Sequence, residues 1–238
     1  MEEFTRIVGL STLGYPEVRN IAGLPFTRYR TRKFQNLYKI PAWFHYKICD
    51  TTNDRLTNSF RDLDLSPCDL YHFFNGISYG RKPWLTTFET VLPRWGPVSE
   101  QLIREGVELL AGESCKKILA ISECTATLQR EHLQRVAPDI TPLILGKLAV
   151  MHPPQALKIS GLSEKKEIKR TVSFIFVGGD FFLKGGREMI QSFEMLHKEG
   201  YNNWHLTIIS PIEKGYINNH LNQISVQHAV SLAPFGTM

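Results

Sequence analysis

From residue 68 to residue 151 the sequence alternates between short strand-like runs and longer segments that have the spacing of amphipathic helices. The runs cover 69–74, 84–88, 118–121 and 148–151, and they are rich in apolar, aromatic and β-branched residues. Such runs are typical of parallel strands that helices cover on both faces. The strand–helix–strand rhythm predicts βαβ units and therefore a Rossmann-like parallel-sheet domain over residues 1–157.

Polar caps mark where the helices between these runs begin. Ser99 is a suitable N-cap for the first of them, because the residues after it carry an apolar stripe at helical spacing. Ser122 is a second N-cap candidate. The helix that it would open carries Leu128, His132 and Val136 at intervals of four residues, which predicts that this stripe faces the sheet.

The same rhythm restarts after a connector. Residues 158–170 are rich in lysine and serine and contain few apolar residues, which predicts an exposed linker. A buried strand at 172–177, a helix over 187–198 and a strand at 204–209 then form one further βαβ unit. We therefore predict an α/β chain in which a Rossmann-like domain is followed by the beginning of a second one, over 171–238.

The first 67 residues give weaker signals. The composition of 4–10 and of 43–48 favours strands in both places. Leu24–Pro25–Phe26 and Ile40–Pro41 are typical of turns or of the first residues of strands.

Composition narrows the class of protein. The 238 residues include 28 Lys/Arg and 23 Asp/Glu, a formal net charge of +5, and residues 1–170 hold the excess (24 − 18 = +6). No apolar run approaches the roughly 18 residues that a membrane span needs. The acidic start, Met1–Glu2–Glu3, is unlike a secretory signal. We therefore expect a cytoplasmic globular protein, one that could be peripheral to a membrane surface.

The four cysteines, Cys49, Cys68, Cys115 and Cys124, form no Cys-x-x-Cys pair. This spacing argues against a zinc ribbon and against a thioredoxin-type redox motif. We expect free, buried thiols, no metal site and no cofactor.

Basic and aromatic residues alternate from Arg28 to Phe34, and the basic character continues to Lys39. This Arg28–Lys39 segment could form a strand with one cationic edge. We favour a solvated strand whose arginine stems cover the sheet. Contact with an anionic membrane surface and stacking against a nucleic acid are the alternatives. Nucleic acid is the least favoured partner, because the patch is short and the net charge is modest.

A glycine-rich loop with one lysine follows the run at 172–177. Gly178, Gly179, Lys184 and Gly185 lie between a predicted strand and the start of a predicted helix. Glycines let the backbone approach an anion closely, a helix N-terminus is electropositive, and lysine adds a mobile charge. The combination suits a nucleotide diphosphate. The spacing matches neither the Walker motif nor Gly-x-Gly-x-x-Gly, and composition alone favours glycines that serve packing.

The stretch Val-Gly-Gly-Asp-Phe-Phe-Leu-Lys-Gly-Gly, 177–186, resembles the opening of the C-terminal domain in retaining glycosyltransferases of family 4. Upstream stretches agree with that family in order and spacing: 69–75, 83–89, 121–123 and 150–154. The resemblance covers roughly residues 68–210. It implies a GT-B fold with an acceptor-side and a donor-side domain. It also implies transfer of a sugar, with retention, from a nucleotide-diphosphate sugar to an unknown glycan, lipid-linked or small-molecule acceptor.

The resemblance further implies roles for residues of the loop. Lys184 would bind the diphosphate of the donor, and the backbone N–H groups of Gly178, Gly179 and Gly185 would assist. Many family members place an arginine directly after the Val-Gly pair, where this chain has Gly179.

Two residues near predicted strand ends are candidates for contact with the acceptor or the transferred sugar. His72 would lie at the carboxyl end of a strand, either hydrogen-bonding a ligand or satisfied within the core. Glu89 could bind sugar hydroxyls, although a surface ion pair with Arg94 or Lys82 explains it better. An N-cap role explains Ser122 better than contact with a ligand.

One element of the family is not found here. Family members carry a Glu-x7-Glu pair in the donor domain, whereas no acidic residue follows Glu213. The sequence therefore leaves two functions open. One is a glycosyltransferase that is incomplete or inactive as this chain, so that we expect no turnover of sugar nucleotide. The other is a non-catalytic GT-B-like protein that binds a nucleotide or glycan or serves as a scaffold.

Overall fold

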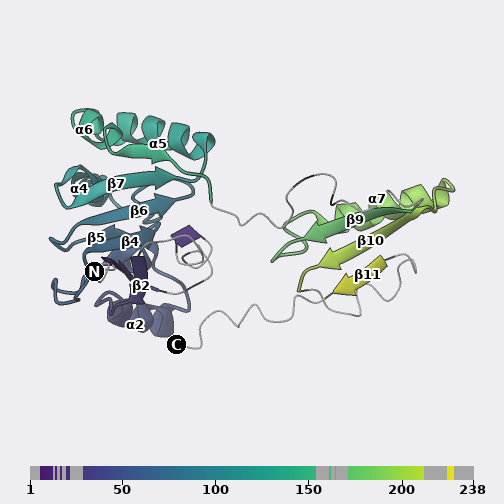
Figure 1. Cartoon of the computed structure of the whole chain (residues 1–238), viewed down its shortest axis with the longest axis horizontal. Helices are drawn as coiled ribbons and strands as arrows, with labels where there is room; N and C mark the ends of the chain where they lie inside the picture. The colour runs from purple at the N-terminus through teal and green to yellow at the C-terminus, as the bar shows by residue number, and fades with distance from the viewer. Residues whose placement is uncertain are drawn as a thin grey trace. The chain divides into compact units, whose positions relative to one another are not determined.

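The chain divides into two compact units, residues 1–157 and 158–238, in a computed structural model (Figure 1). The structure describes residues 6–12, 14, 17, 20–21, 29–153, 161, 164, 171–211 and 224–227. The linker predicted at 158–170 lies outside the described residues except for 161 and 164, and so does the turn predicted at 24–26.

A six-stranded parallel sheet forms the centre of the first unit. Its strands are β1 (Arg6–Leu10), β2 (Tyr29–Lys33), β4 (Leu70–Phe74), β6 (Trp84–Phe88), β7 (Cys115–Ala120) and β8 (Leu148–Val150). They are ordered β2-β1-β4-β6-β7-β8, and every neighbouring pair is parallel. The strand predicted over 4–10 is confirmed for its described residues, 6–10. The four strands predicted between residues 69 and 151 are confirmed as well. Because the chain moves outward from β1 to β2 and then returns to β4, its winding direction reverses between β1 and β4.

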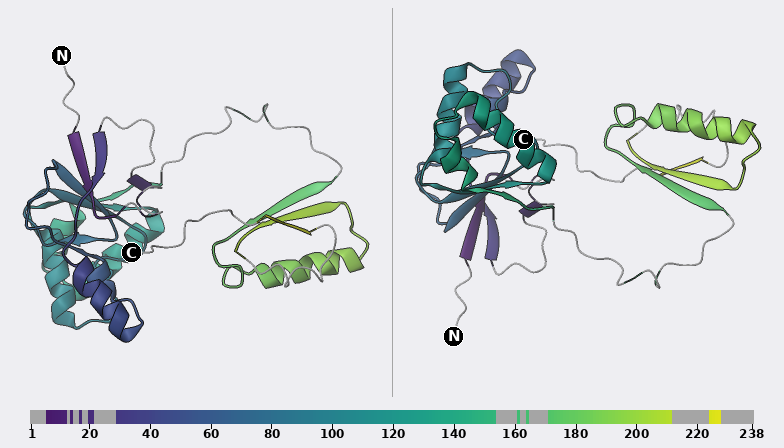
Figure 2. Two further views of the ribbon diagram at one scale, coloured as in Figure 1. Left: turned by 90° about the horizontal axis from the view of Figure 1, so that it is seen from below. Right: turned by 90° about the horizontal axis from the view of Figure 1, so that it is seen from above.

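Helices α4 (Glu100–Ala111), α5 (Glu123–Val136) and α6 (Thr141–Leu145) pack against one face of this sheet (Figure 2). Tyr71 of β4 and Trp84 of β6 share a buried core with Val107 of α4 and Leu133 of α5. Side chains alternate between the two faces of a strand. His72, next to Tyr71, therefore lies on the opposite face of the sheet.

Smaller elements complete the first unit. Helix α2 (Lys39–Cys49) and the short α3 (Asp54–Thr57) follow β2 along the chain. The strands β3 (Ser59–Phe60) and β5 (Ile77–Ser78) form a separate parallel pair. No helix in the described part of the chain is both long and apolar enough to cross a membrane.

The N-caps predicted for α4 and α5 are both present. Ser99 Oγ accepts the N–H of Leu102 at 3.4 Å, and Ser122 Oγ accepts the N–H of Thr125 at 3.1 Å. The stripe predicted for α5 is wrong in phase, because Leu128 is 44% exposed. The buried side of α5 consists of Thr125, Ala126, Gln129 and Leu133. This side is partly polar because Gln129 forms hydrogen bonds with the buried backbone of Leu92.

The strand predicted over 43–48 is wrong, because these residues belong to helix α2. Aromatic and branched residues favour strands, and their density here suggested one. Ile40, Phe44 and Ile48 nevertheless recur every four residues, which is helical spacing. Pro41 lies in the first turn of α2, where a missing N–H costs no intrahelical hydrogen bond.

The second unit contains a three-stranded parallel sheet and one described helix. Its elements are β9 (Val172–Val177), α7 (Gly186–Lys198), β10 (Trp204–Ile209) and β11 (Ile224–Gln227). The sheet order is β11-β10-β9, and both pairs are parallel. One side of α7 and one face of β10 form a core of Phe181, Ile190, Phe193, Trp204, Leu206 and Ile208. The predicted α/β class, a Rossmann-like domain followed by the beginning of a second, is confirmed.

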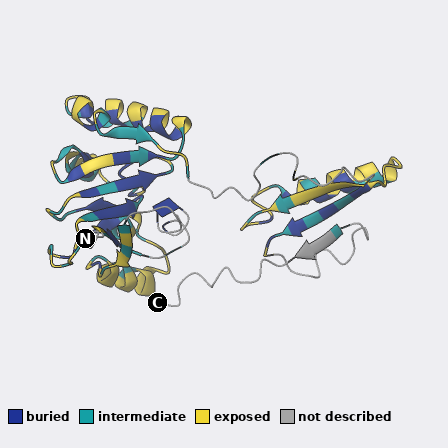
Figure 3. Ribbon diagram, viewed as in Figure 1, coloured by how far each residue is buried: buried dark blue, intermediate teal, exposed yellow. Residues whose placement is uncertain are grey.

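Strand β9 differs from its prediction as a buried strand. Most of its residues are exposed, and Val177 is 70% exposed (Figure 3). Within the described residues β9 pairs with β10 alone, at one edge of the sheet. An apolar run predicts a strand, but it does not tell a central strand from an edge strand.

The cysteines are free, as predicted, but only one of them is buried. Cys115 lies in the core of the first unit, whereas Cys68 is half-buried and Cys49 and Cys124 are exposed. Cys49 is exposed because it belongs to α2, whose side chains are largely outside the core.

Candidate functional site

Three polar residues meet just beyond the carboxyl ends of β4 and β6. Asn75 follows β4 in the left-handed backbone conformation (φ 59°), which asparagine tolerates. Its Oδ1 accepts the N–H of Glu89 at 3.3 Å, and its Nδ2 lies 3.5 Å from Oε1 of Glu89. The Glu89 carboxylate forms an ion pair with Arg94, one of the two partners that the sequence offered. Parallel α/β sheets bind ligands at this edge, so the three residues are the candidate site of the first unit.

Helix α5 fixes the loop that carries Glu89 and Arg94. Thr125 Oγ1 donates to the carbonyl of Glu89 at 3.1 Å. The fully buried Gln129 accepts the N–H of Leu92 at 2.6 Å and donates to its carbonyl at 3.0 Å. A buried backbone group left unpaired costs roughly 1–3 kcal/mol, so Gln129 is a strong positioning residue. Sequence analysis missed it, because a polar residue in a helix suggests the solvent side.

Ser122 has the capping role that the sequence favoured. Its Oγ donates to Thr125 Oγ1 at 3.0 Å in addition to accepting the Thr125 N–H. Beyond β8, the exposed His152 has its Nδ1 3.2 Å from the carbonyl of Ile121. His152 therefore adds an imidazole to the same edge of the sheet. It lies there because β8, which it follows, pairs in parallel with β7.

His72 lies in the middle of β4, not at the carboxyl end where the sequence placed it. It is 8% exposed, and its Nε2 lies 2.8 Å from Oγ1 of Thr87 on β6. In register it pairs with Leu85, four residues before Glu89. At about 3.3 Å per residue, His72 and Glu89 are roughly 13 Å apart along the strands. The structure does not bring these two candidates together.

Burial lowers the pKa of His72 from 6.5 to about 3. The imidazole is therefore neutral near neutral pH and binds through hydrogen bonds rather than through charge. A general base is most effective when its pKa lies near the working pH, so His72 is a weak one. It suits positioning better than proton transfer.

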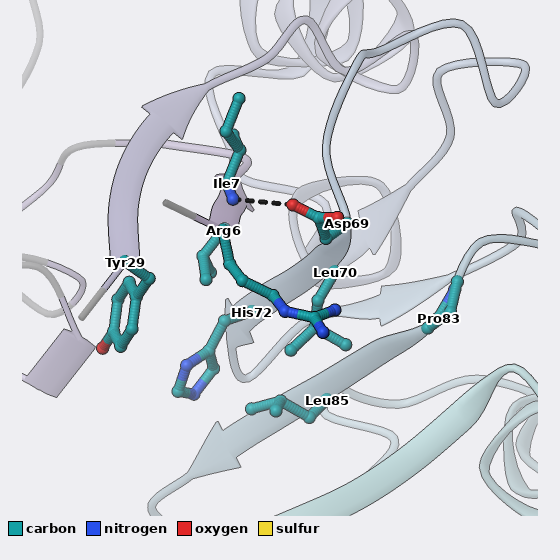
Figure 4. A pocket seen from close by; sticks show the side chains of 9 residues that line it. Arg6, Ile7, Tyr29, Asp69, Leu70, His72, Pro83 and Leu85 are labelled. Atoms are coloured by element: carbon teal, nitrogen blue, oxygen red, sulfur yellow. Dashed lines mark hydrogen bonds between the residues drawn. The ribbon is translucent and has the colours of Figure 1, made fainter. Parts of the chain in front are cut away.

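A pocket of about 510 Å³ opens beside His72 (Figure 4). It is lined by Arg6, Ile7, Val8, Tyr29, Asp69, Leu70, His72, Pro83 and Leu85. Asp69 Oδ2 accepts the N–H of Ile7 at 2.8 Å and so joins β1 to the segment before β4. Most of the lining residues belong to the first residues of their strands. The pocket thus lies toward the amino edge of the sheet, opposite to the edge where α/β sheets bind ligands.

The second candidate site is the loop 178–185 between β9 and α7. Lys184 is exposed close to the start of α7. Gly185 is the N-cap of this helix and has no side chain to cap it, and the N–H of Gly186 donates to the carbonyl of Phe181 at 2.8 Å. Within the described part of the chain, no carboxylate forms an ion pair with Lys184. An uncapped helix N-terminus beside an exposed lysine is suited to an anion.

The glycines of this loop, and Gly186 at the start of α7, differ in whether the structure requires a glycine there. Gly185 has a left-handed backbone (φ 80°), which favours glycine. A Cβ at Gly186 would lie 2.3 Å from the ring of Phe181, and one at Gly178 would lie 3.3 Å from neighbouring side chains. A Cβ at Gly179 would meet nothing within 4 Å. Packing or conformation therefore explains three of the glycines, and neither requires Gly179.

Two of the three N–H groups expected to face a diphosphate are already bonded. The N–H of Gly178 donates to the carbonyl of Ile209 at 3.1 Å, and that of Gly185 donates to Phe182 at 3.2 Å. Of these three glycines, only Gly179 has an N–H that donates to no group among the described residues. Of the three backbone N–H groups that the sequence predicted for diphosphate binding, only that of Gly179 is therefore available.

Arg187 is a second cation at this loop, and sequence analysis missed it. It lies in the first turn of α7, with its guanidinium carbon 5.5 Å from the centre of the Phe182 ring. Its place three residues after Lys184, at the start of a predicted helix, was the available signal. Asp180 in the loop and Glu188 in the first turn add two negative charges. The local net charge is therefore zero.

Comparisons with known proteins give a distant likeness among solved structures. No protein-family model matches the chain, and no curated protein matches it. Among solved structures, the chain is similar to one described as "Crystal Structure Analysis of the Glycotransferase of kitacinnamycin". The two are 12% identical with a TM-score of 0.43, over 94% of this chain and 70% of that chain. A likeness at that level carries no argument about function, so function has to be argued from the residues.

Proposed function

We propose that this chain binds a nucleotide-diphosphate sugar at the β9–α7 loop and is a retaining glycosyltransferase of the family 4, GT-B type. The observation that carries this proposal is the exposed Lys184 beside the uncapped N-terminus of α7, with the unobstructed Gly179 in the same loop. The resemblance of residues 177–186 to the donor loop of that family supports the choice of ligand.

The loop has the parts that stabilise a diphosphate leaving group. Lys184 provides a full positive charge on a flexible stem, and the first turn of α7 provides N–H groups and the positive end of the helix dipole. Gly179 leaves its N–H accessible to an approaching oxygen. Negative charge develops on the diphosphate as the sugar departs, and donors already in place stabilise that charge most effectively.

The first unit would bind the acceptor. Asn75 and Glu89 present an amide and a carboxylate at the carboxyl edge of the sheet, and Arg94 and Gln129 hold them in place. Such groups bind sugar hydroxyls through paired donors and acceptors. His72, as a neutral imidazole, would either hydrogen-bond a ligand or hold Thr87 of β6 in place.

A non-catalytic nucleotide- or glycan-binding protein is the second candidate. The observation that favours it is the zero net charge of the loop, where Asp180 and Glu188 offset Lys184 and Arg187. Product analysis with uridine, guanosine, adenosine and thymidine diphosphate sugars tests for transfer. Release of the nucleoside diphosphate would establish the transferase and overturn the expectation of no turnover, whereas binding without release fits an inactive transferase and the second candidate alike.

Substitution of Lys184 by alanine is expected to weaken nucleoside-diphosphate binding by about 10- to 100-fold, because a hydrogen bond to a charged group contributes about 1.5–3 kcal/mol. Isothermal titration calorimetry with UDP, GDP, ADP and dTDP measures the affinity. The matched control is Lys198→Ala, which removes an exposed lysine from the other end of the same helix.

The control should bind as the unchanged protein does. Equal affinities for the unchanged chain and Lys184→Ala would remove Lys184 from the site. Absence of binding for all four nucleotides would contradict the proposed function as a whole.

A further inference from the structure

Helix α2 turns its apolar side away from the protein. None of its eleven residues is buried, and Ile40, Phe44 and Ile48 are 60%, 54% and 80% exposed (Figure 3). These three residues recur every four positions, and the exposed Trp43 lies beside them with its ring centre 4.9 Å from that of Phe44. Surface helices of globular proteins normally show the reverse arrangement, with apolar residues inward.

The inward side of α2 is small. Ala42 and His45 are the half-buried residues of the helix, and His45 Nδ1 lies 3.1 Å from the carbonyl of Thr51. The buried Asn36 fixes the start of the helix, because its side chain accepts the N–H of Tyr38 at 3.1 Å and donates to the Ser59 carbonyl at 2.8 Å. The exposed apolar face is therefore held by the fold rather than left over from a frayed segment.

The chain segment that carries this face is basic. Residues 29–50, which include β2 and α2, contain five Lys/Arg and one Asp, a net charge of +4. Lys39 and Lys47 lie on α2 itself, and the exposed Arg30, Arg32 and Lys33 lie on the preceding strand β2. Burial and the neighbouring charge of Lys33 lower the pKa of Lys39, and the nearby carboxylate of Glu17 acts in the opposite direction.

We propose that α2 is a docking surface for an anionic lipid bilayer. The helix lies along the membrane surface with Ile40, Phe44 and Ile48 in the boundary between headgroups and acyl chains. An apolar face with aromatic residues, bordered by lysine and arginine, is the pattern of interfacial helices. Each basic residue near an anionic surface adds about 1 kcal/mol of attraction.

Lys47 favours a lipid surface over a protein partner. It lies within the apolar face, with its Nζ 6.0 Å from the ring centre of Trp43. Lysine is depleted at the cores of protein–protein interfaces, where its charge would be desolvated. At a bilayer its stem stays with the apolar residues while its ammonium reaches the headgroups. This inference does not depend on the proposed nucleotide site, which lies in the other unit.

Vesicle flotation tests the docking surface. The full chain should bind vesicles of phosphatidylglycerol mixed with phosphatidylcholine, bind vesicles of phosphatidylcholine alone more weakly, and dissociate as sodium chloride is raised. The double variant Phe44→Ser, Ile48→Ser should bind the anionic vesicles at least about tenfold more weakly, since it removes two apolar anchors. Both side chains are exposed, so the fold should remain intact.

The control is Leu128→Ser, Leu143→Ser, which removes two exposed leucines from α5 and α6 and should leave binding unchanged. Absence of vesicle binding by the unchanged chain, or equal binding by Phe44→Ser, Ile48→Ser, would overturn the proposal. Light scattering after gel filtration tests the remaining occupant. A dimer that the Phe44→Ser, Ile48→Ser change dissociates, without vesicle binding, would assign this face to a second copy of the chain.

Discussion

Acidification from about pH 7 to pH 5 is expected to remove about 2 kcal/mol from the unfolding free energy of the first unit through His72 alone. In the folded chain burial lowers the pKa of His72 from 6.5 to about 3. In the unfolded chain the imidazole returns to its ordinary pKa. Each pKa unit of difference corresponds to about 1.4 kcal/mol between the two protonation states.

The direction of the effect follows from which state binds the proton. Because the folded pKa is the lower one, the unfolded chain binds more protons than the folded chain between pH 6.5 and about 3. The first unit is therefore not destabilised by His72 above pH 6.5. Stability is lost progressively as the pH falls from there toward 3, where the group has its full effect.

Urea unfolding of His72→Gln measures this contribution. A Trp204→Phe background leaves only Trp43, Trp84 and Trp95, so that tryptophan fluorescence reports on the first unit. His72→Gln should lose about 2 kcal/mol less than the unchanged histidine between about pH 7 and pH 5, whatever its stability at pH 7. The matched control is His152→Gln, which removes an exposed histidine from the same unit. Parallel pH profiles for His72 and His72→Gln would show that the imidazole is not held neutral by burial.

Substitution of Gly186 by alanine is expected to cost the second unit about 2–3 kcal/mol, because the added methyl group overpacks a core. The new Cβ would lie 2.3–2.5 Å from three atoms of the Phe181 ring. That ring is buried and packs edge-on against Phe176 at 5.5 Å, so it has little room to move aside.

The same substitution at Gly179 is the matched control. Nothing lies within 4 Å of its added Cβ, so the stability of the unit should change by less than about 0.5 kcal/mol. Hydrogen–deuterium exchange of β10 measures both variants, since Leu206 and Ile208 lie in the core that Phe181 joins. Gly186→Ala should accelerate exchange throughout β10, and Gly179→Ala should leave it unchanged. Equal protection in the two variants would contradict the packing role of Gly186.

The parts of the fold that the sequence predicted are those with local signals. Strands β4 and β6 are short runs rich in apolar and aromatic residues, and Ser99 and Ser122 mark helix starts through hydrogen bonds to residues three positions on. Helix α2 was predicted as a strand because its aromatic content outweighed its spacing. The exposure of its apolar side could not be predicted for a further reason. A helical period shows that one side is apolar, but it does not show whether that side faces a core or another surface.

The candidate sites divide in the same way. The β9–α7 loop was predictable because Lys184 and its glycines are consecutive in sequence. The individual roles of Gly178 and Gly179 were not, since they depend on the hydrogen bond from Gly178 to Ile209 of β10 and on the side chains that lie near Gly178 but not near Gly179. The separation of His72 from Glu89 depends on strand register. Gln129 was missed because its partner Leu92 is 37 residues away.

Nuclear magnetic resonance of the nitrogen-15-labelled chain tests the central claim, diphosphate binding at the β9–α7 loop, most directly. UDP, GDP, ADP and dTDP are titrated in turn, and the amide resonances of both units are followed. The account predicts that the nucleotide which binds shifts the Gly179 amide most strongly, together with the first turn of α7, and leaves the amide of Lys198 at the far end of the helix in place. A saturable response elsewhere with an unmoved Gly179 amide would contradict it.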